Sequence, residues 1–503
     1  MSSCSVETFM GLGMLSGFVL GARLASPLIL SLVVVAVARG ADEVAIAPAV
    51  LMERGEYAAA EAALKAQIAD EDAPVTDQAA RNLEILRRTR MEFPLDAAAV
   101  LKELQAELPD ATAADVARWT ESDALVHRTI DGEVRYFRRA VRNLFLLDAA
   151  ARQRRDAARQ AAGADQAETP PFDLRNHVRE LVRLAEDAAE LEILPIRHRV
   201  NYALTVHADH PRAEPGAVVR AWLPYPQEYR QQSDVRLIRS SPSEPLIAAA
   251  SAPQRTAYFE QTIHDAGAPL RFEIELEFVT RAYCPKLDTE LAEPYDLHGD
   301  VYREFTAERL PHIALTPEVR AMAAEIVGDE TNPLEKARLV FRWVSHNIPW
   351  CSEMEYSIIP NLSGKGLGKR RGDCGVQGMS FIALCRAAGV PARWQSGWQT
   401  KPGKSNMHDW AEFYVEPWGW LPADASYGVM DDPDPRVRDF FCGHMDPYRF
   451  IVNLDYGREL EPPKTSFRSE PNDFQRGEVE IDGHNLYFDE WDYEFAVEST
   501  PLE

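Results

Sequence analysis

The chain has 503 residues, 46% of them hydrophobic, which is enough material for about three or four structural units. With 79 acidic residues against 54 basic ones its formal charge is −25, and this argues against a nucleic-acid-binding protein because phosphates attract basic surfaces. The same charge favours cationic substrates, such as lysine-bearing chains or amines.

The first 40 residues differ in kind from the rest, because they contain two apolar stretches and a single acidic residue. The second stretch, residues 28–37, has the length of a signal-peptide hydrophobic region and is too short to cross a bilayer. Ala36-Val37-Ala38 then matches a small-x-small cleavage site. We therefore predict that residues 1–40 are a signal peptide and that the protein is exported, to the periplasm or outside the cell. The alternative is an uncleaved N-terminal anchor, which would place the protein at a membrane.

Residues 42–190 are rich in Ala, Leu, Glu and Arg and predict a helical region. Five arginines lie close together in this segment: Arg138, Arg139, Arg152, Arg154 and Arg155. Because acidic residues surround them, we interpret them as a solvated helix face and not as a binding patch.

The apolar pattern changes to a period of two within residues 196–283. Val200, Tyr202 and Leu204 alternate with polar neighbours, and so do Phe272 and Ile274. Prolines and glycines punctuate the span between these two runs. This pattern predicts a small antiparallel domain of the β-sandwich type.

Residues 284–456 return to helical spacing and contain the segment with the clearest chemistry. Asp373 is a good helix N-cap and Gly389 a good stop, so Cys374 should occupy the first position of a helix of about four turns. Free backbone N–H groups and the helix dipole at that position stabilise a thiolate and lower the thiol pKa from about 8.5. The charge of Asp373 opposes this effect unless its carboxylate is used for capping.

After residue 40 the chain has five cysteines, Cys284, Cys351, Cys374, Cys385 and Cys442. The odd number leaves at least one thiol unpaired, and no two cysteines have the C-x-x-C spacing of a zinc site or a redox pair. We therefore predict no metal and no cofactor. Cys385, on the same helix as Cys374, is predicted to be a buried hydrophobic residue.

A candidate general base follows in a predicted hairpin that turns at residues 417–419. His408 and Asp424 are 16 residues apart, and a turn centred on Glu416 would place them opposite each other. Moving the turn by one residue would keep them on one face but two positions apart. Together with Cys374 they would supply nucleophile, base and orienting carboxylate. Asp409 could replace Asp424 as the orienting group, but adjacent strand residues point to opposite faces.

Each of the three residues alone has a structural explanation, as a buried thiol, a strand histidine and a capping aspartate. All three together, in this order and around a helix N-terminus, favour a catalytic site.

These segments also resemble the transglutaminase-like superfamily. The resemblance rests on three motifs between residues 316 and 427: Gly372-Asp373-Cys374-Gly375, His408-Asp409-Trp410-Ala411-Glu412, and Gly419-Trp420 leading to Asp424. It implies a papain-like α+β core in which the helix with Cys374 packs on an antiparallel sheet. It also implies that Cys374 is the nucleophile, His408 the base and Asp424 the orienting group.

The resemblance further implies an oxyanion hole, to which the backbone N–H of Cys374 contributes one donor. A second donor comes from upstream in this family, and Trp350 and Tyr356 are the candidates here. The chain departs from the animal enzymes, because its acidic segment at residues 431–434 lacks the ligand spacing of a calcium site.

From these features we expect an α+β protein with an all-α region at 42–190, a β-sandwich at 196–283, a catalytic domain at 284–456 and a β extension at 457–503. In the extension, Asp482-Gly483 predicts the turn of a hairpin. The predicted function is a cysteine-dependent amide-bond enzyme, either a peptidase or amidase or a protein-glutamine acyl transferase. It would act on a protein or peptide through an acyl-thioester, with an amine as co-substrate in the case of transfer.

Two other functions compete with this one. The first is an exported scaffold or binding protein whose transglutaminase-like domain is inactive. The second is a thiol redox protein, which would need a second cysteine, such as Cys351, close to Cys374.

Overall fold

A computed structural model describes residues 46–69, 76–163, 172–265 and 267–502. The predicted signal peptide or anchor at residues 1–40 lies outside this part of the chain. Within the described ranges, none of the helices is both long enough and apolar enough to span a membrane. From Ala47 onward the chain forms one unit by its internal contacts.

The N-terminal region is built mainly of short helices. They are α1 (Pro48–Arg54), α2 (Tyr57–Ala69), α3 (Thr76–Glu92), α4 (Ala97–Glu107), α5 (Ala113–Glu121), α6 (Ala140–Leu147), α7 (Ala149–Ala161) and α8 (Leu174–Asp187). Helices α1 to α7 contribute to one hydrophobic cluster, whereas Val178 and Leu181 of α8 are buried in the core of the next helical region.

The prediction that this region is purely helical is wrong at one place. Strands β1 (His127–Ile130) and β2 (Glu133–Tyr136) form an antiparallel hairpin there. Its turn is Asp131-Gly132, in which both residues have positive φ, 51° and 83°. An Asp-Gly pair favours this type of tight turn, so the signal is local and readable.

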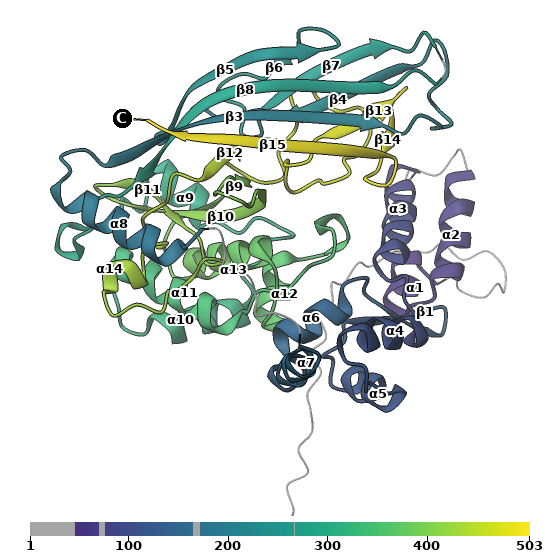
Figure 1. The fold of residues 1–503 in the computed structure, drawn as a ribbon, viewed down its shortest axis with the longest axis horizontal. Coiled ribbons are helices and arrows are strands. Elements are labelled where there is room, and N and C mark those ends of the chain that lie inside the picture. Colours follow the sequence, from purple (N-terminus) through teal and green to yellow (C-terminus); the bar gives the residue numbers. More distant parts are fainter. Residues whose placement is uncertain (1–45, 70–75, 164–171, 266, 503) are drawn as a thin grey trace, which may run out of the picture. The chain divides into compact units, whose positions relative to one another are not determined.

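Two antiparallel sheets form the predicted β-sandwich, and strands of the C-terminal tail complete both of them (Figure 1). The four-stranded sheet has the order β15 (Trp491–Pro501), β3 (Glu192–Val206), β8 (Leu270–Tyr283), β5 (Gln232–Ser241). The five-stranded sheet has the order β14 (His484–Leu486), β13 (Glu478–Ile481), β4 (Val218–Pro224), β7 (Thr256–Thr262), β6 (Leu246–Ile247). Val200, Tyr202 and Leu204 are buried in the shared core, as their alternation predicts.

The predicted hairpin of the tail is confirmed. Strands β13 and β14 pair in antiparallel register, and Asp482 and Gly483 between them have φ values of 47° and 75°.

The remaining region is a helical layer on a four-stranded sheet. Its helices are α9 (Asp300–Thr306), α10 (Pro317–Val327), α11 (Pro333–Asn347), α12 (Leu362–Lys369), α13 (Cys374–Ala387) and α14 (Pro435–Arg438), with short 3-10 turns at Thr289–Leu291 and Tyr356–Ile358. The sheet has the order β11 (Gly419–Ala423), β10 (Asn406–Val415), β9 (Ala392–Gln399), β12 (Arg449–Asn453). The α+β class expected from the sequence is confirmed.

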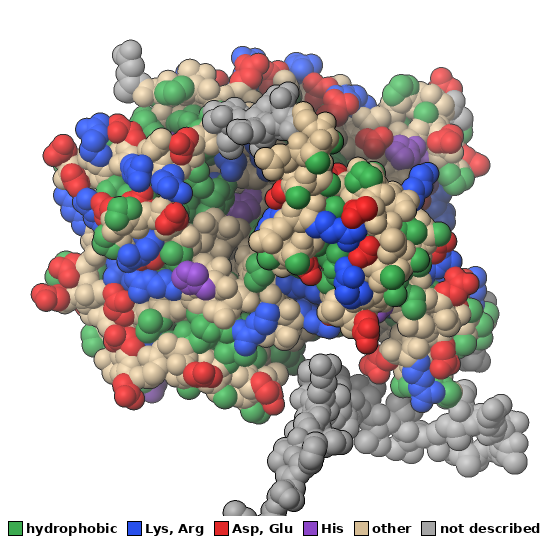
Figure 2. Space-filling model, turned by 60° about the horizontal axis from the view of Figure 1, so that its bottom comes forward, with side chains coloured by type: hydrophobic (Ala, Val, Ile, Leu, Met, Phe, Trp, Pro, Cys, Tyr) green, Lys and Arg blue, Asp and Glu red, His purple; other side chains and the backbone are tan. Residues whose placement is uncertain are grey.

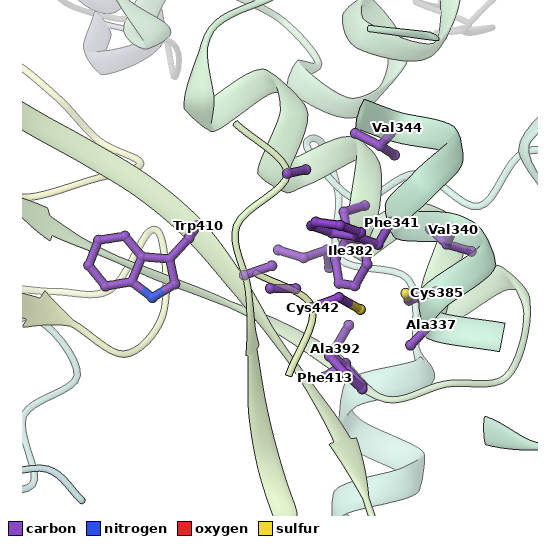
Figure 3. Close-up of a cluster of buried hydrophobic side chains, with 14 of the residues drawn as sticks. Ala337, Val340, Phe341, Val344, Ile382, Cys385, Ala392, Trp410, Phe413 and Cys442 are labelled. Carbon is purple, nitrogen blue, oxygen red and sulfur yellow. The ribbon is translucent and has the colours of Figure 1, made fainter. Parts of the chain in front are cut away.

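Helix α13 lies at the centre of this core. Figure 3 shows Ile382 and Cys385 of α13 among side chains from α11, β9 and β10, with the sulfur atoms of Cys385 and Cys442 lying near each other. All five cysteines of the described part are free. Cys385 is fully buried, as predicted, and burial raises its pKa well above that of an ordinary thiol.

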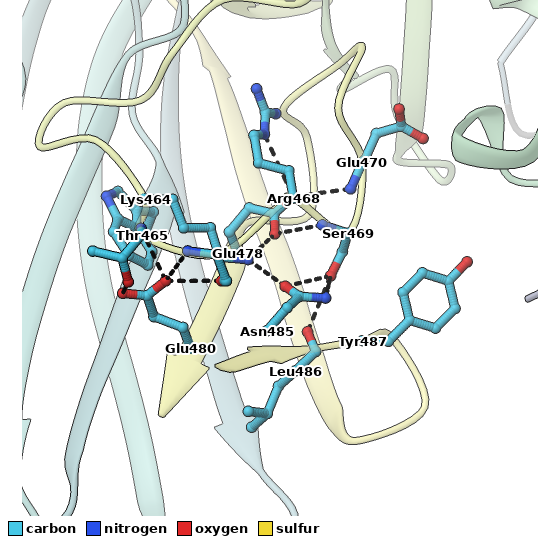
Figure 4. Close-up of polar contacts among 12 residues, drawn as sticks. Lys464, Thr465, Arg468, Ser469, Glu470, Glu478, Glu480, Asn485, Leu486 and Tyr487 are labelled. Carbon is cyan, nitrogen blue, oxygen red and sulfur yellow. Dashed lines mark hydrogen bonds and ion pairs between the residues drawn. The ribbon is translucent and has the colours of Figure 1, made fainter. Parts of the chain in front are cut away.

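A loop between β12 and β13 is fixed to the sandwich by two buried glutamates (Figure 4). Glu478 accepts hydrogen bonds from the backbone N–H groups of Ser469 and Glu470, at 2.8 and 2.9 Å, and pairs with Lys464 at 2.7 Å. Glu480 accepts from Ser466 N at 3.1 Å. Because these bonds satisfy backbone donors in the loop, they fix the path of the residues that follow it, up to residue 477.

Candidate active site

Cys374 is the first residue of α13, as the sequence predicts. The carboxylate of Asp373 caps the helix by accepting a hydrogen bond from Val376 N at 3.2 Å. In the described part of the chain the backbone N–H of Cys374 donates to no other group, so it is free to act as an oxyanion donor. Gly375 must be glycine, because a Cβ there would lie 2.1 Å from the hydroxyl of Tyr356.

His408 and Asp424 form a buried pair. His408 Nε2 lies 2.7 Å from Asp424 Oδ2, and Arg449 Nη2 donates to the same oxygen at 2.9 Å. Burial alone would raise the pKa of Asp424, but the charges of His408 and Arg449 outweigh burial and lower it. An ionised Asp424 accepts the Nε2 proton of His408, which leaves Nδ1 as the basic nitrogen.

The pairing register explains how the two residues meet. Ala411 lies opposite Ala423 and Val415 opposite Gly419, so the turn is centred one residue later than Glu416. This is the second of the two registers considered from the sequence. His408 and Asp424 are therefore offset along the hairpin but stay on one face, within hydrogen-bonding distance.

The thiol of Cys374 contacts a different residue. It donates a hydrogen bond to Asp409 Oδ2 at 3.2 Å, and no hydrogen bond joins it to His408 in the part of the chain that the structure describes. The alternation of the strand is the reason: Phe413, on the same face as Asp409, packs against Phe381 of α13 with ring centroids 6.1 Å apart. Figure 3 shows Trp410, which shares the face of His408, pointing to the other side of the strand.

Asp409 is therefore a neighbour of the sulfur and not the partner of His408. Its Oδ2 also accepts a hydrogen bond from the Tyr356 hydroxyl at 2.8 Å, and its Oδ1 accepts one from Gln475 Nε2 at 2.7 Å. Burial, followed by the charges of Asp473 and Asp373, raises the pKa of Asp409 well above its ordinary value.

The expectation that the helix N-terminus lowers the pKa of Cys374 is wrong for this arrangement. Burial, followed by the negative charges of Asp409 and Asp373, raises the pKa of the thiol well above its usual value. Burial likewise raises the pKa of Asp373 to about 7, with a smaller contribution from Glu353. In this conformation Cys374 is a thiol and not a thiolate.

The two oxyanion candidates lie at the same site but differ in their contacts. The hydroxyl of Tyr356 accepts a hydrogen bond from Gly375 N at 3.1 Å and lies 3.0 Å from Asp373 Oδ2. Trp350 is 38% exposed, and the guanidinium of Arg142 lies over its ring, 5.6 Å from the centroid. Of the two, the hydroxyl of Tyr356 lies next to the backbone at Cys374, and in this conformation its proton is donated to Asp409 Oδ2.

A cavity of about 360 Å³ opens beside Cys374. Its walls come from distant parts of the chain: the start of α6, the segment before α12, the start of α13, β10, the loop that precedes β13, and the tail around Phe488 and Tyr493. Among its lining residues are Arg138, Arg139, Arg142, Trp350, Glu355, Tyr356, Asp373, Asp409, Glu470, Asp473, Gln475 and Arg476. Cys351, the candidate redox partner, is buried and is not among the residues that line this cavity.

Three further residues at the site have no signal in the sequence: Asp473, Gln475 and Arg476. They belong to an irregular loop with no motif, and they reach the site only because the tail joins the sandwich. Arg139, predicted to lie on a solvated face, is exposed and also lines the cavity.

Comparisons with known proteins agree with the resemblance. The family model of the transglutaminase-like superfamily matches residues 320–425. An uncharacterized protein of Haemophilus influenzae is 30% identical over 160 residues, which are 26% of this chain and 42% of that protein. The uncharacterized protein YebA of Bacillus subtilis is 25% identical over 137 residues, 24% of this chain and 18% of that protein. The chain thus covers less than half the length of either relative.

Among solved structures, a "putative cysteine protease" from Cytophaga hutchinsonii is 17% identical with a TM-score of 0.41, covering 62% of this chain and 91% of that one.

Proposed function

We propose that this protein is a cysteine-dependent amide-bond enzyme in which Cys374 forms an acyl-thioester, because residues 320–425 match the family model of the transglutaminase-like superfamily. The observation that carries the proposal is the buried pair of His408 and Asp424, 2.7 Å apart, in the domain whose central helix begins at Cys374. A histidine that is held by a carboxylate in this way can act as a general base and accept a proton from a nucleophile.

The proposed reaction requires a rearrangement in which Cys374 leaves Asp409 and comes within hydrogen-bonding distance of His408, which lies on the opposite face of β10 in this conformation. His408 Nδ1 takes the thiol proton while the sulfur forms a C–S bond to the carbonyl carbon of an amide. The backbone N–H of Cys374 stabilises the resulting oxyanion, and the hydroxyl of Tyr356 adds a second donor once its proton is released from Asp409. The C–N bond then breaks as His408 passes its proton to the leaving amine.

The second half of the reaction decides between hydrolysis and transfer. Water or an amine attacks the thioester carbon, His408 accepts the attacking group's proton, and that proton returns to the sulfur as the C–S bond breaks. The substrate is accordingly a protein or peptide, with an amine as second substrate in the case of transfer.

Two assays on one protein substrate test this proposal. Release of fluorescent peptides from labelled casein reports hydrolysis, and incorporation of dansylcadaverine into casein reports transfer. We expect Cys374→Ala to abolish whichever activity the wild type has. Cys351→Ala, which removes a buried thiol outside the cavity, should retain it. Equal activity of Cys374→Ala and the wild type would refute the proposal.

The Asp409 contact favours a second candidate, a scaffold or binding protein without catalysis. A thiol that donates to a carboxyl group and has a raised pKa is a poor nucleophile. If this candidate holds, cells that carry Cys374→Ala will be indistinguishable from wild-type cells, whereas deletion of the whole gene will change them.

We also propose that the protein works outside the cytoplasm. The support is the apolar stretch at residues 28–37 and the small-x-small pattern that follows it.

A further inference from the structure

Three arginines at the start of α6 line the same cavity as Cys374: Arg138, Arg139 and Arg142. Arg138 has acidic partners, Glu92 at 3.0 Å and Glu355 at 3.4 Å. Arg139 and Arg142 form no ion pair within the described part of the chain. At the mouth of a nucleophile's cavity, these two positive charges thus have no acidic group within ion-pair distance, although Glu355 and Glu92 lie near enough to Arg139 to raise its pKa.

The acidic groups of the cavity do not neutralise these two charges. Glu355 pairs with Arg476 as well as with Arg138, and Glu353 pairs with Lys365. Burial raises the pKa of Glu470 to about 8 and that of Asp373 to about 7, so at neutral pH Glu470 is largely protonated and Asp373 about half protonated.

Arg139 lies in a locally basic environment, although its side chain is exposed. Partial desolvation, followed by repulsion from Arg138 and Arg142, lowers the pKa of its guanidinium more than the opposing charges of Glu355 and Glu92 raise it. Arg142 is placed by its contact with Trp350, whose ring lies 5.6 Å from the guanidinium carbon. Since Trp350 also lines the cavity, this contact directs the charge of Arg142 towards the site.

This pair does not belong to a broad basic surface. The chain has a net charge of −25, and on the face that Figure 2 shows, basic and acidic side chains are intermingled. A locally unbalanced pair in such a protein indicates selection for one anionic group and not for a general attraction of anions.

We propose that Arg139 and Arg142 bind a carboxylate of the peptide whose carbonyl Cys374 attacks. The inference rests on the proposed function, because it assigns a substrate class to the same site. Arginine suits this role, since its planar guanidinium can donate two parallel hydrogen bonds to one carboxylate. The carboxylate can come from an acidic side chain or from the free C-terminus of the peptide. This proposal differs from both sequence-based expectations, a solvated arginine face and a cationic substrate.

Three chloroacetyl dipeptides test the inference without knowledge of the natural substrate. In each case the Cys374 sulfur displaces chloride and forms a C–S bond. Chloroacetyl-Gly-Gln amide is neutral, chloroacetyl-Gly-Glu amide has a side-chain carboxylate, and chloroacetyl-Gly-Gln acid has a C-terminal one. The rate of Cys374 modification is measured for each by mass spectrometry of the digested protein.

We expect at least one of the acidic reagents to modify Cys374 about tenfold faster than the neutral one, which is the scale of one charge-assisted contact. The acid that reacts faster identifies the source of the carboxylate. The preference should shrink as NaCl is raised, because the contact lies at a solvent-accessible mouth.

The double variant Arg139→Gln/Arg142→Gln should lose this preference while it keeps the rate of the neutral reagent. Arg175→Gln is the matched control, because it removes an exposed arginine that has no ion pair in the described ranges and lies outside the cavity. An unchanged rate with the neutral reagent also verifies that the double variant is folded around Cys374.

The two proposals fail in different ways. Equal rates with all three reagents, or a preference that survives in the double variant, would overturn the carboxylate site and leave the cysteine enzyme intact. Failure of all three reagents to modify Cys374 would overturn the proposed function and the carboxylate site with it.

Discussion

At the scale of single residues, the reactivity of Cys374 is set by a competition between two effects. Its place at the N-terminus of α13 favours the thiolate, whereas burial and the carboxyl groups of Asp409 and Asp373 favour the thiol. The second effect wins in this conformation. Asp409 is therefore the residue whose removal should change the thiol most.

Asp409→Asn should lower the pKa of Cys374. Where Asp409 is ionised, the substitution removes a negative charge 3.2 Å from the sulfur, so the charged thiolate costs less to form. The rate of iodoacetamide labelling against pH measures this: the wild-type rate should still be rising above pH 9, and the variant's midpoint should lie lower by about one unit.

Glu121→Gln is the control, because Glu121 is an exposed acid remote from the cavity. A midpoint that stays in place or moves upward in Asp409→Asn would show that the Asp409 charge does not govern the thiol.

The sequence predicts the chemistry of single residues better than their contacts. Four residues of the site could be found because each has a local signal in the sequence, which is a helix cap, a strand pattern or a motif. They are Cys374, Asp373, His408 and Asp424. The contact between the thiol and Asp409 could not be predicted from the sequence, because it depends on which face of β10 packs against α13.

At the scale of elements, the first turn of α13 is fitted to Tyr356 through Gly375. Gly375→Ala would place a Cβ 2.1 Å from the Tyr356 hydroxyl, which is itself bonded to Asp409. We expect a loss of about 1–3 kcal/mol in the free energy of unfolding, the usual cost of overpacking, together with loss of activity. Urea denaturation measures the first and the casein assays the second.

Gly368→Ala in α12 is the matched control. A Cβ there would meet nothing within 4 Å, so the substitution should stabilise the protein slightly by improving helix propensity. If Gly375→Ala were as stable and active as Gly368→Ala, the contact with Tyr356 would have no role.

Elements with a clear period or turn are predictable, and their partners are not. The alternation at Val200–Leu204 and the turn at Asp482-Gly483 give correct strands. The sequence does not indicate that β13 pairs with β4 or β15 with β3, because such pairings join residues far apart in the chain.

At the scale of the whole molecule, the site depends on three segments that lie far apart in the sequence. Helix α13 brings the thiol, the start of α6 brings the arginines, and the loop before β13 brings Gln475 and Asp473. The sequence analysis treated these segments as separate domains, and only the long-range contacts show that they share one cavity.

Export is a property of the whole chain and has a direct test. Expressed in a bacterium with an intact secretion system, the protein should be recovered outside the cytoplasm with its first residues removed near Ala38. Sequencing of the mature N-terminus decides between a cleaved signal and an uncleaved anchor.

The central claim is that Cys374 accepts an acyl group with the help of His408. Acylation by p-nitrophenyl acetate, followed by mass spectrometry of the intact and digested protein, measures this step directly. We expect one acetyl group on Cys374 of the wild type, none on Cys374→Ala, and a rate reduced about a hundredfold or more in His408→Asn. Acetylation elsewhere, or an equal rate in the wild type and His408→Asn, would contradict it.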